Sequence, residues 1–212
     1  MTKSKNPLEF LKERVVMKHP ILSYYSLHPL GYCILDVVNR TTQKREYANV
    51  TKLDLARFLR IKPNLFSYHY KKLIEKKYLE YKDLKGFRII DGNLKDDMCS
   101  CTGGTFTVID LNLFEKLEIS IVQYCIMHSV FVTNYLCWEK YSNTSKQKFC
   151  NSLNISRTGF EKAVKSLEQF EYMFCFPYGL FLNDLLVIEF YSVHDEDFKK
   201  LQSAISKSDN TN

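Results

Sequence analysis

The sequence predicts a mainly α-helical protein of the α+β class, made of two similar units in tandem that each end in a small β-hairpin. One observation behind this prediction is a repeat without gaps: TKLDLARFLRIKPNLFSYHYKKLIEKKYLEY, from Thr51, aligns with SKQKFCNSLNISRTGFEKAVKSLEQFEYMFC, from Ser145, 94 residues later. A repeat at a fixed offset indicates a duplicated structural unit. The other is the length, because 212 residues suit two units of about 100 residues that each bury a modest core.

The chain is expected to begin with two helices. Residues 6–17 are expected to form the first, because Asn6 can cap it and Pro7 fits its first turn. In that helix, apolar residues would share one face: Leu8, Leu11 and Val15. Residues 29–42 are expected to form the first core helix of the unit.

A helix–turn–helix motif is expected next. Thr51 caps its first helix, with Asp54 three residues later in an acidic variant of the capping box. Ile61 fills the turn, and Pro63 fits the start of the second helix, which is expected to reach residue 77. The apolar residues of that helix recur at helical spacing: Phe66, Tyr70, Leu73 and Ile74.

A hairpin and a linker are expected to complete the first unit. Residues 78–82 and 87–90 flank a short loop that contains glycine, which predicts a β-hairpin. Residues 91–104 (DGNLKDDMCSCTGG) combine turn residues, acids and a glycine pair, which is typical of a linker. The predicted division of the chain is a first domain over 1–92, a linker over 93–105, a second domain over 106–194 and a polar tail over 195–212.

The second unit is expected to repeat the first. Its predicted elements are a strand over 106–111, a long helix over 119–138, a motif helix over 157–170, and a hairpin of 172–176 with 185–191. The stretch 119–138 carries no Asp, Glu, Lys or Arg and is long enough to span a bilayer. Its flanking residues are Glu118 and Glu139 rather than basic ones, so we expect a buried helix and no membrane partner.

Charge is distributed unevenly along the chain. Residues 1–95 contain 20 Lys and Arg against 9 Asp and Glu, a net charge of +11. Residues 96–212 contain 10 against 15, a net charge of −5, and together these give the overall +6. Such asymmetry predicts that the first half contacts a polyanion and that the second half mainly serves another purpose.

The segment LRIKPNLFSYHYKKLIEKKYLE, within residues 50–91, resembles the winged helix-turn-helix superfamily, as found in bacterial regulators. Residues 145–191 resemble it as well. The superfamily usually carries glycine before the first strand of the wing, where this chain has Lys77 and Glu171. Two winged helices in one short chain resemble plasmid and phage replication initiators and transcriptional regulators with duplicated domains. The resemblance implies binding to double-stranded DNA.

Candidate DNA contacts follow from the expected docking, in which the second motif helix enters the major groove with its N-terminal end nearest the bases. The base-reading candidates are Asn64, Ser67 and Tyr68, and the phosphate-contact candidates are Lys62, Lys71 and Lys72. The wing is expected to reach an adjacent groove or the backbone with Lys82, Lys85 and Arg88. The second unit offers Arg157, Thr158 and Lys162.

Each of these residues also has a simpler interpretation, because a lysine-rich helix face is usually a solvated surface with acids that pair within the helix. The agreement of turn, helix, hairpin and net charge favours the DNA interpretation. The second hairpin lacks Lys and Arg and contains Phe174 and Phe176. The second unit therefore either binds DNA through its helix alone or forms a protein contact.

The sequence argues against an enzyme and predicts no cofactor and no metal. The five histidines are scattered, and neither a glycine-rich phosphate loop nor a nucleophile motif occurs. Seven cysteines include no Cys-x-x-Cys pair, which favours reduced thiols in a cytoplasmic protein without a secretory signal. Cys99 and Cys101 flank Ser100 at a spacing that matches no standard zinc pattern.

The sequence thus predicts a sequence-specific double-stranded-DNA-binding protein, in the first place a transcriptional regulator. A plasmid or phage replication initiator that binds origin repeats is an alternative of the same class. A protein-interaction scaffold that never touches DNA is the alternative of another class. A homodimer is expected, with the uncharged helix over 119–138 as its contact.

Overall fold

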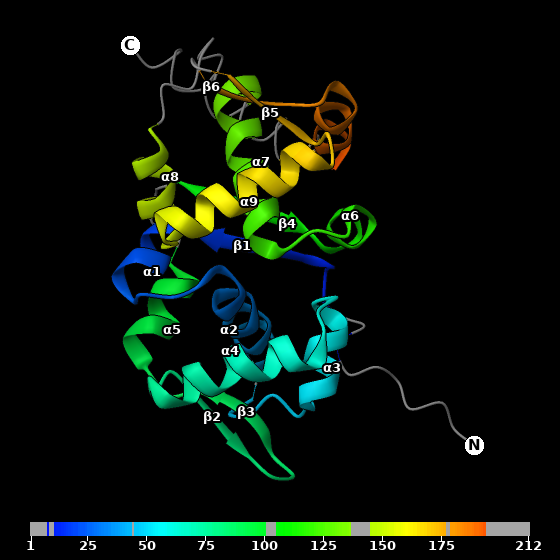
Figure 1. Cartoon of the computed structure of the whole chain (residues 1–212). Coiled ribbons are helices and arrows are strands. Elements are labelled where there is room, and N and C mark those ends of the chain that lie inside the picture. The colour runs from blue at the N-terminus through cyan, green and yellow to red at the C-terminus, as the bar shows by residue number, and fades with distance from the viewer. Residues whose placement is uncertain are drawn as a thin grey trace, which may run out of the picture.

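The computed structural model describes residues 8, 11–43, 45–100, 105–136, 145–176 and 179–193. Figure 1 shows two halves, one above the other, with strands β1 and β4 between them. The first half contains β1 (Arg14–Lys18), α1 (His19–Tyr24), α2 (Pro29–Thr42), α3 (Lys52–Phe58), α4 (Pro63–Glu75), β2 (Leu79–Lys82), β3 (Gly86–Ile89) and α5 (Gly92–Cys99). The second half contains β4 (Phe106–Asp110), α6 (Leu111–Leu117), α7 (Ile121–Phe131), the π-helical turn η1 (Val132–Leu136), α8 (Lys146–Leu153), α9 (Arg157–Gln169), β5 (Met173–Phe176), β6 (Gly179–Leu182) and a helix over 184–193.

The described part of the chain is an α+β fold of helices with three antiparallel two-stranded sheets: β1–β4, β2–β3 and β5–β6. This confirms the predicted class. Several predicted elements are confirmed as well, among them the core helix α2, the strand β4, the Thr51–Asp54 capping box and the hairpin β2–β3.

The duplication extends well beyond the repeat that the sequence shows. Helices α3 and α8, helices α4 and α9, and strands β2 and β5 begin 94 residues apart, whereas β1 and β4, and α2 and α7, begin 92 residues apart. The backbone repeats too, because three positions with positive φ recur in both halves. These pairs are Ser26 and Glu118 (49° and 52°), Arg60 and Asn154 (56° and 48°), and Lys77 and Glu171 (56° and 57°).

The last of these pairs shows how the chain enters its hairpins without a glycine before the first strand. Lys77 and Glu171 follow the C-terminal ends of α4 and α9, and both adopt the left-handed conformation that glycine adopts at low cost. Their backbone N–H groups donate to carbonyls in the last turns of those helices, from Lys77 to Ile74 and from Glu171 to Glu168. These hydrogen bonds offset part of the conformational cost.

The prediction of a helix over 6–17 is wrong where the structure describes it. Residues Arg14–Lys18 form β1, which pairs with β4 in an antiparallel register that places Val16 opposite Val108. The spacing of Leu8, Leu11 and Val15 also fits a helix, so the local sequence pattern alone could not distinguish a helix from a strand. The partner strand lies more than 90 residues away, and pairing with it satisfies the backbone of a segment rich in β-branched residues.

The predicted linker is also wrong over residues 92–99, which form α5. Asp91 caps this helix by accepting a hydrogen bond from the Leu94 amide at 2.9 Å. Leu94 and Met98, four residues apart, are buried against the first half. The residues that were expected to form turns thus form the start of a helix. Cys101 lies outside the described residues.

The second hairpin is made from a different strand than predicted. β5 pairs with β6 at Gly179–Leu182, and the run 185–191 is helical. Asn183 starts this helix by accepting from the Leu185 amide at 2.9 Å. Leu186 and Phe190, one helical turn apart, are both buried. The four consecutive apolar residues from 185 made this helical spacing difficult to recognise in the sequence. The polar tail lies outside the described residues.

The uncharged stretch 119–138 begins as predicted with a buried helix. Ser120 and Gln123 form a capping box at the start of α7, and almost every residue of α7 is buried among α2, α9 and the strands. This position rules out α7 as the dimer contact proposed above, because its surface is already covered. None of the described helices combines the length and apolarity needed to cross a membrane.

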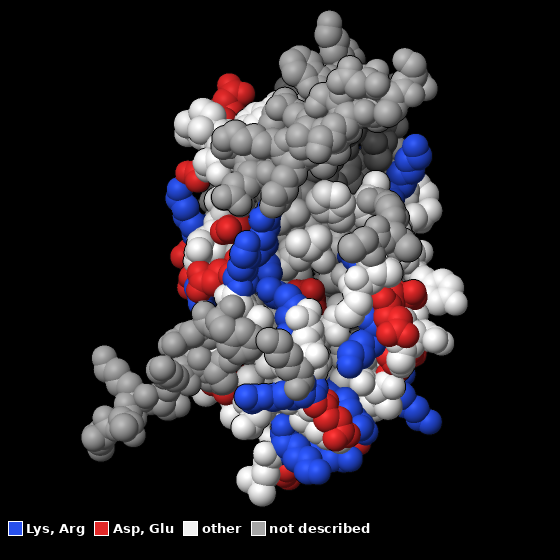
Figure 2. Space-filling model, turned by 180° about the vertical axis from the view of Figure 1, so that it is seen from behind, with Lys and Arg blue, Asp and Glu red and all other residues white. Residues whose placement is uncertain are grey.

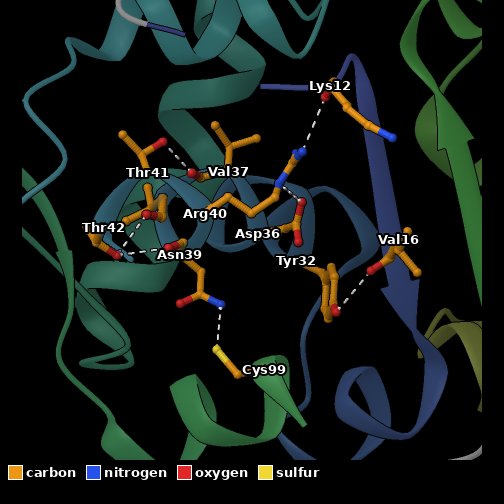
Figure 3. A network of polar contacts seen from close by, with 11 residues as sticks. Lys12, Val16, Tyr32, Asp36, Val37, Asn39, Arg40, Thr41, Thr42 and Cys99 are labelled. Atoms are coloured by element: carbon orange, nitrogen blue, oxygen red, sulfur yellow. Dashed lines mark hydrogen bonds and ion pairs between the residues drawn. The ribbon is translucent and has the colours of Figure 1, made fainter. Parts of the chain in front are cut away.

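Helix α2 lies at the centre of the first half, and its polar side chains tie neighbouring segments to it (Figure 3). Arg40 forms an ion pair with Asp36 at 2.9 Å. The other ties are hydrogen bonds: Arg40 to the Lys12 carbonyl, the Tyr32 hydroxyl to the Val16 carbonyl, and the Asn39 amide to the Cys99 sulfur. The N-terminal segment, β1 and α5 are therefore all held by one helix.

The buried apolar side chains of the two halves form one continuous cluster in space, which includes Leu8 in the first half and Phe190 in the second. Helix α1 of the first half packs on α8 of the second. At this contact the His19 ring, which is buried, bridges Thr107 Oγ1 at 2.8 Å and Ser152 Oγ at 2.6 Å. The Asn154 amide donates to the Leu27 carbonyl at 3.0 Å beside it.

Candidate nucleic-acid interface

Helix α4 and its N-cap present half of the residues predicted to contact DNA, on one face. Its opposite face is buried through Phe66, His69 and Leu73. The exposed residues are Asn64, Leu65, Tyr68, Lys71 and Lys72, with Ser67 half-buried and Lys62 exposed at the N-cap. Helical spacing therefore brings these predicted contacts together.

Two side chains of α4 have geometry that bears on base reading. The Asn64 carbonyl oxygen accepts from the Leu65 amide at 2.8 Å, which holds the side chain at the first turn and leaves its NH2 group available. Tyr68 is 54% exposed, and the Lys72 ammonium lies 4.4 Å from the centre of its ring. A cation over an aromatic ring is stabilised by the ring quadrupole, so the pair forms a positively charged, flat surface.

The first hairpin carries a cluster of cations around the ring of Tyr47. Lys82, Lys85 and Arg88 lie 5.5, 5.7 and 4.9 Å from its centre. The Tyr47 hydroxyl donates to Glu80 at 2.9 Å, and this hydrogen bond is the main cause of a lowered pKa of Glu80. The hairpin cations are thus placed by a tyrosine that the sequence did not single out.

The three hairpin cations differ in how much charge they can offer. Arg88 is half-buried and pairs with Glu46 at 2.5 Å and with Glu80 at 2.8 Å, so its charge is largely compensated. Lys82 lies 3.4 Å from Glu80. Lys85 is exposed in the turn and forms no ion pair among the described residues. Of these three, Lys85 is the side chain most free to meet a phosphate.

Helix α9 repeats this arrangement with fewer uncompensated cations. Arg157 is exposed but pairs with Glu161 one turn later at 3.0 Å. Thr158 and Lys162 are exposed, and Lys162 also lines a cavity beside the helix. In the adjoining hairpin, Phe174 and Phe176 are exposed. The strands of the second hairpin also carry no Lys or Arg, in contrast to those of the first.

Helices α4 and α9 lie across the same face of the molecule and run in opposite directions, α4 in the lower half and α9 in the upper (Figure 1). Between them lies His28, the N-cap of α2, whose ring is 4.3 Å from the ring of His69 on α4 and which lines the cavity beside α9. Helices α4 and α9, which carry predicted contact residues of the two halves, therefore lie on one face.

The sequence did not reveal the cavity beside α9. Its walls include the N-caps of three helices, His28 for α2, Ser120 for α7 and Ser156 for α9. Each is recognisable locally as a helix start, but their convergence depends on the way the two halves pack. The described residues contain no cluster of three or more His, Cys, Asp or Glu side chains placed to hold a metal ion.

Comparison with known proteins gives no further guide to this face. No family model, no curated protein and no solved structure matches the chain.

Proposed function

We propose that this protein is a sequence-specific double-stranded-DNA-binding protein with two winged helix-turn-helix units, and that α4 and α9 are their recognition helices. The observation that carries the proposal is the placement of these two helices, antiparallel on one face (Figure 1). In dimeric DNA-binding proteins, recognition helices related by a two-fold axis enter major grooves about one helical turn apart. Here the internal duplication supplies both helices from one chain.

The distribution of side chains supports α4 as the main reader. Its exposed face combines an amide, a hydroxyl and an aromatic ring with lysines that form no ion pair among the described residues: Lys62, Lys71 and Lys72. Lysines supply phosphate contacts, and Asn64 can pair with an adenine edge. On the opposite side of the molecule, basic and acidic side chains are interspersed (Figure 2). That mixture is less suited to a polyanion.

Within this class we favour a transcriptional regulator over a replication initiator at origin repeats. Both roles fit a chain that places two recognition helices on one duplex. The DNA fragments that the protein selects distinguish the two roles. A regulator is expected to select fragments with single sites near promoters, and an initiator is expected to select fragments with several copies of one site.

One observation favours the scaffold as the second candidate. The second half exposes apolar side chains on its hairpin and on the helix over 184–193: Phe174, Phe176, Leu185 and Ile188. Exposed apolar groups of this kind occur at protein contacts. A scaffold has no need of the +11 charge of residues 1–95, which is why DNA binding ranks first.

The test is binding of the full-length protein to a pool of genomic duplex fragments at about 150 mM salt, where simple attraction to the backbone is already screened. Selective retention of a few fragments, confirmed by fluorescence anisotropy, is the expected result. Binding that appears only at low salt and without selection would favour the scaffold, and a protein partner would then be sought.

The expected homodimer stays a prediction, and its contact has to lie elsewhere than on α7. Sedimentation of the protein at micromolar concentration, alone and with a selected duplex, tests it. A monomer that protects two adjacent major grooves would show that one chain reads both half-sites by itself.

A further inference from the structure

A surface cavity of about 490 Å³ lies beside α9, and one of its lining residues, His28, contacts His69 of α4. Residues of α9 between Gly159 and Ser166 line it, together with His28 and the start of α7 at Ser120 and Gln123. None of the described residues that line it is an Asp or Glu, and Lys162 gives it a positive charge. A cavity with these walls is suited to an anion.

Gln123 offers a side-chain hydrogen-bond donor to this cavity. It is 8% exposed, and its carbonyl oxygen accepts from the Ser120 amide at 2.7 Å in the capping box of α7. That hydrogen bond fixes the orientation of the side-chain amide. The NH2 group at Nε2 has no hydrogen-bond partner among the described residues, and the side chain lines the cavity. This donor is therefore available to a ligand in the cavity, where it can donate a hydrogen bond to an acceptor.

His28 supplies a second donor. Its Nδ1 accepts from the Leu30 amide at 3.2 Å, and burial, with His69 and Lys72 nearby, lowers the pKa of the ring to about 4. The ring is therefore neutral at pH 7, and with Nδ1 accepting it carries its proton on Nε2. A neutral ring of this tautomer donates a hydrogen bond over the whole physiological pH range.

Helix dipoles add to these donors. The N-caps of α2, α7 and α9 all line the cavity, and these helices are 14, 11 and 13 residues long. The N-terminal end of a helix carries a partial positive charge and favours a negatively charged group. Three such ends, two neutral donors and one ammonium point to a phosphate rather than to a carboxylate-bearing side chain, because a phosphate oxygen can accept from several directions at once.

We propose that this cavity binds a backbone phosphate of the duplex at the point where the DNA passes from α4 to α9. The inference rests on the proposed function. It adds to the two recognition helices a third contact with the DNA, which does not depend on the base sequence. The phosphate seated there fixes the register of the DNA relative to both halves, which is the role of phosphate contacts in protein–DNA complexes. The same chemistry would accept the phosphate of a free nucleotide, and the experiment separates the two sources.

The decisive variant is Gln123→Glu. Glu retains the carbonyl-type acceptor of the capping box, where it is a preferred residue, and replaces the NH2 donor with a negatively charged oxygen. Lys162→Gln, on the exposed side of α9, is a second variant that removes the charge without touching the core. Gln43→Glu is the matched control, because it makes the same charge change at the opposite end of α2, about 20 Å from the cavity.

Affinities for a selected duplex and for a random duplex are measured by fluorescence anisotropy, with thermal unfolding as a check on folding. Gln123→Glu is expected to weaken binding to both duplexes by about tenfold or more, since a hydrogen bond to a charged group is lost and a repulsion is added. Lys162→Gln is expected to weaken both in the same direction, whereas Gln43→Glu is expected to bind like the wild type. In parallel, the side-chain amide signal of Gln123, identified by its absence in Gln123→Glu, is followed in ¹⁵N-labelled protein as duplex, inorganic phosphate or ATP is added.

The outcomes separate this inference from the proposed function. If the wild type binds DNA and Gln123→Glu loses no more affinity than Gln43→Glu, the phosphate contact is overturned while DNA binding stands. If no duplex binds but the Gln123 signal shifts with inorganic phosphate or ATP, the duplex is overturned as the occupant and a free phosphate ligand takes its place. If no duplex binds and the signal never shifts, both proposals fail.

Discussion

At the scale of single residues, Asn64 tests whether α4 reads sequence. Its NH2 group is available while its carbonyl oxygen is held by the Leu65 amide. Asn64→Ala should cost about 1–3 kcal/mol of binding free energy at a selected site and little on random DNA, because only a base edge offers the matching pattern. Anisotropy on both duplexes measures this difference. An equal loss on both would place the recognition helix elsewhere.

Lys71 is the matching probe of the backbone contact. It is exposed on α4 and forms no ion pair among the described residues. Lys71→Ala should weaken binding to every sequence. It should also make affinity less dependent on salt, because the magnitude of the slope of log affinity against log salt falls by about one. The control is Lys95→Ala on α5, which packs against α1 and α2. If the control changes the slope as much as Lys71→Ala does, the effect reflects net charge alone.

His19 predicts how stability depends on pH. Burial lowers its pKa from 6.5 to about 4. Below pH 6.5 the unfolded chain therefore takes up a proton that the native ring does not, and stability is lost as the pH falls from 6.5 towards 4. His28 also lowers the stability of the folded protein as the pH falls. Asp36 has the opposite effect, because burial raises its pKa to about 6 and its protonation in the folded state stabilises the protein on acidification.

The variant His19→Gln isolates the contribution of this one ring. Between pH 7 and pH 5, where His28 and Asp36 act equally in both proteins, the variant should lose about 2 kcal/mol less unfolding free energy than the wild type. Urea denaturation at the two pH values measures both. Equal losses would mean that His19 is protonated in the native state at pH 5.

At the scale of elements, two glycines should respond in opposite ways to alanine. Gly86 starts β3 with a φ of 93°, and a Cβ there would lie 1.9 Å from the Ala48 carbonyl oxygen. Gly92 starts α5, and a Cβ there meets nothing within 4 Å. Gly86→Ala should therefore destabilise by roughly 2 kcal/mol or more, and Gly92→Ala should stabilise by about 0.4–1 kcal/mol. Urea denaturation of both variants tests this, and a tolerated Gly86→Ala would contradict the pairing of β3 with Ala48.

Two of the three elements that the sequence misassigned share a cause. In both the N-terminal segment and the run 185–191, the local apolar pattern is compatible with helix and with strand. Pairing decided each case. Arg14–Lys18 pairs with β4, and in the described hairpin Gly179–Leu182 pairs with β5 in place of the run 185–191. By contrast, α3 and α4 were predictable, since the Thr51 cap, Pro63 and the apolar stripe specify them locally.

At the scale of the whole molecule, the shared core predicts cooperative unfolding. The described apolar core crosses from one half to the other, β1 pairs with β4, and α1 packs on α8. Neither half can unfold without exposing the surface of the other. Calorimetry should therefore show one transition, with equal calorimetric and van't Hoff enthalpies. Two resolved transitions would show that the halves are independent domains.

The sequence by itself determined the local features of this protein: the duplication, the two helix–turn–helix segments, the first hairpin and the face of α4 that carries the candidate contacts. These follow from caps, turns and spacing within short stretches of chain. Only the tertiary structure decided that β1 joins β4, that α7 is interior, that α4 and α9 share a face, and that a cavity forms beside α9. Those features depend on contacts between residues some 90 positions apart, which no local pattern encodes.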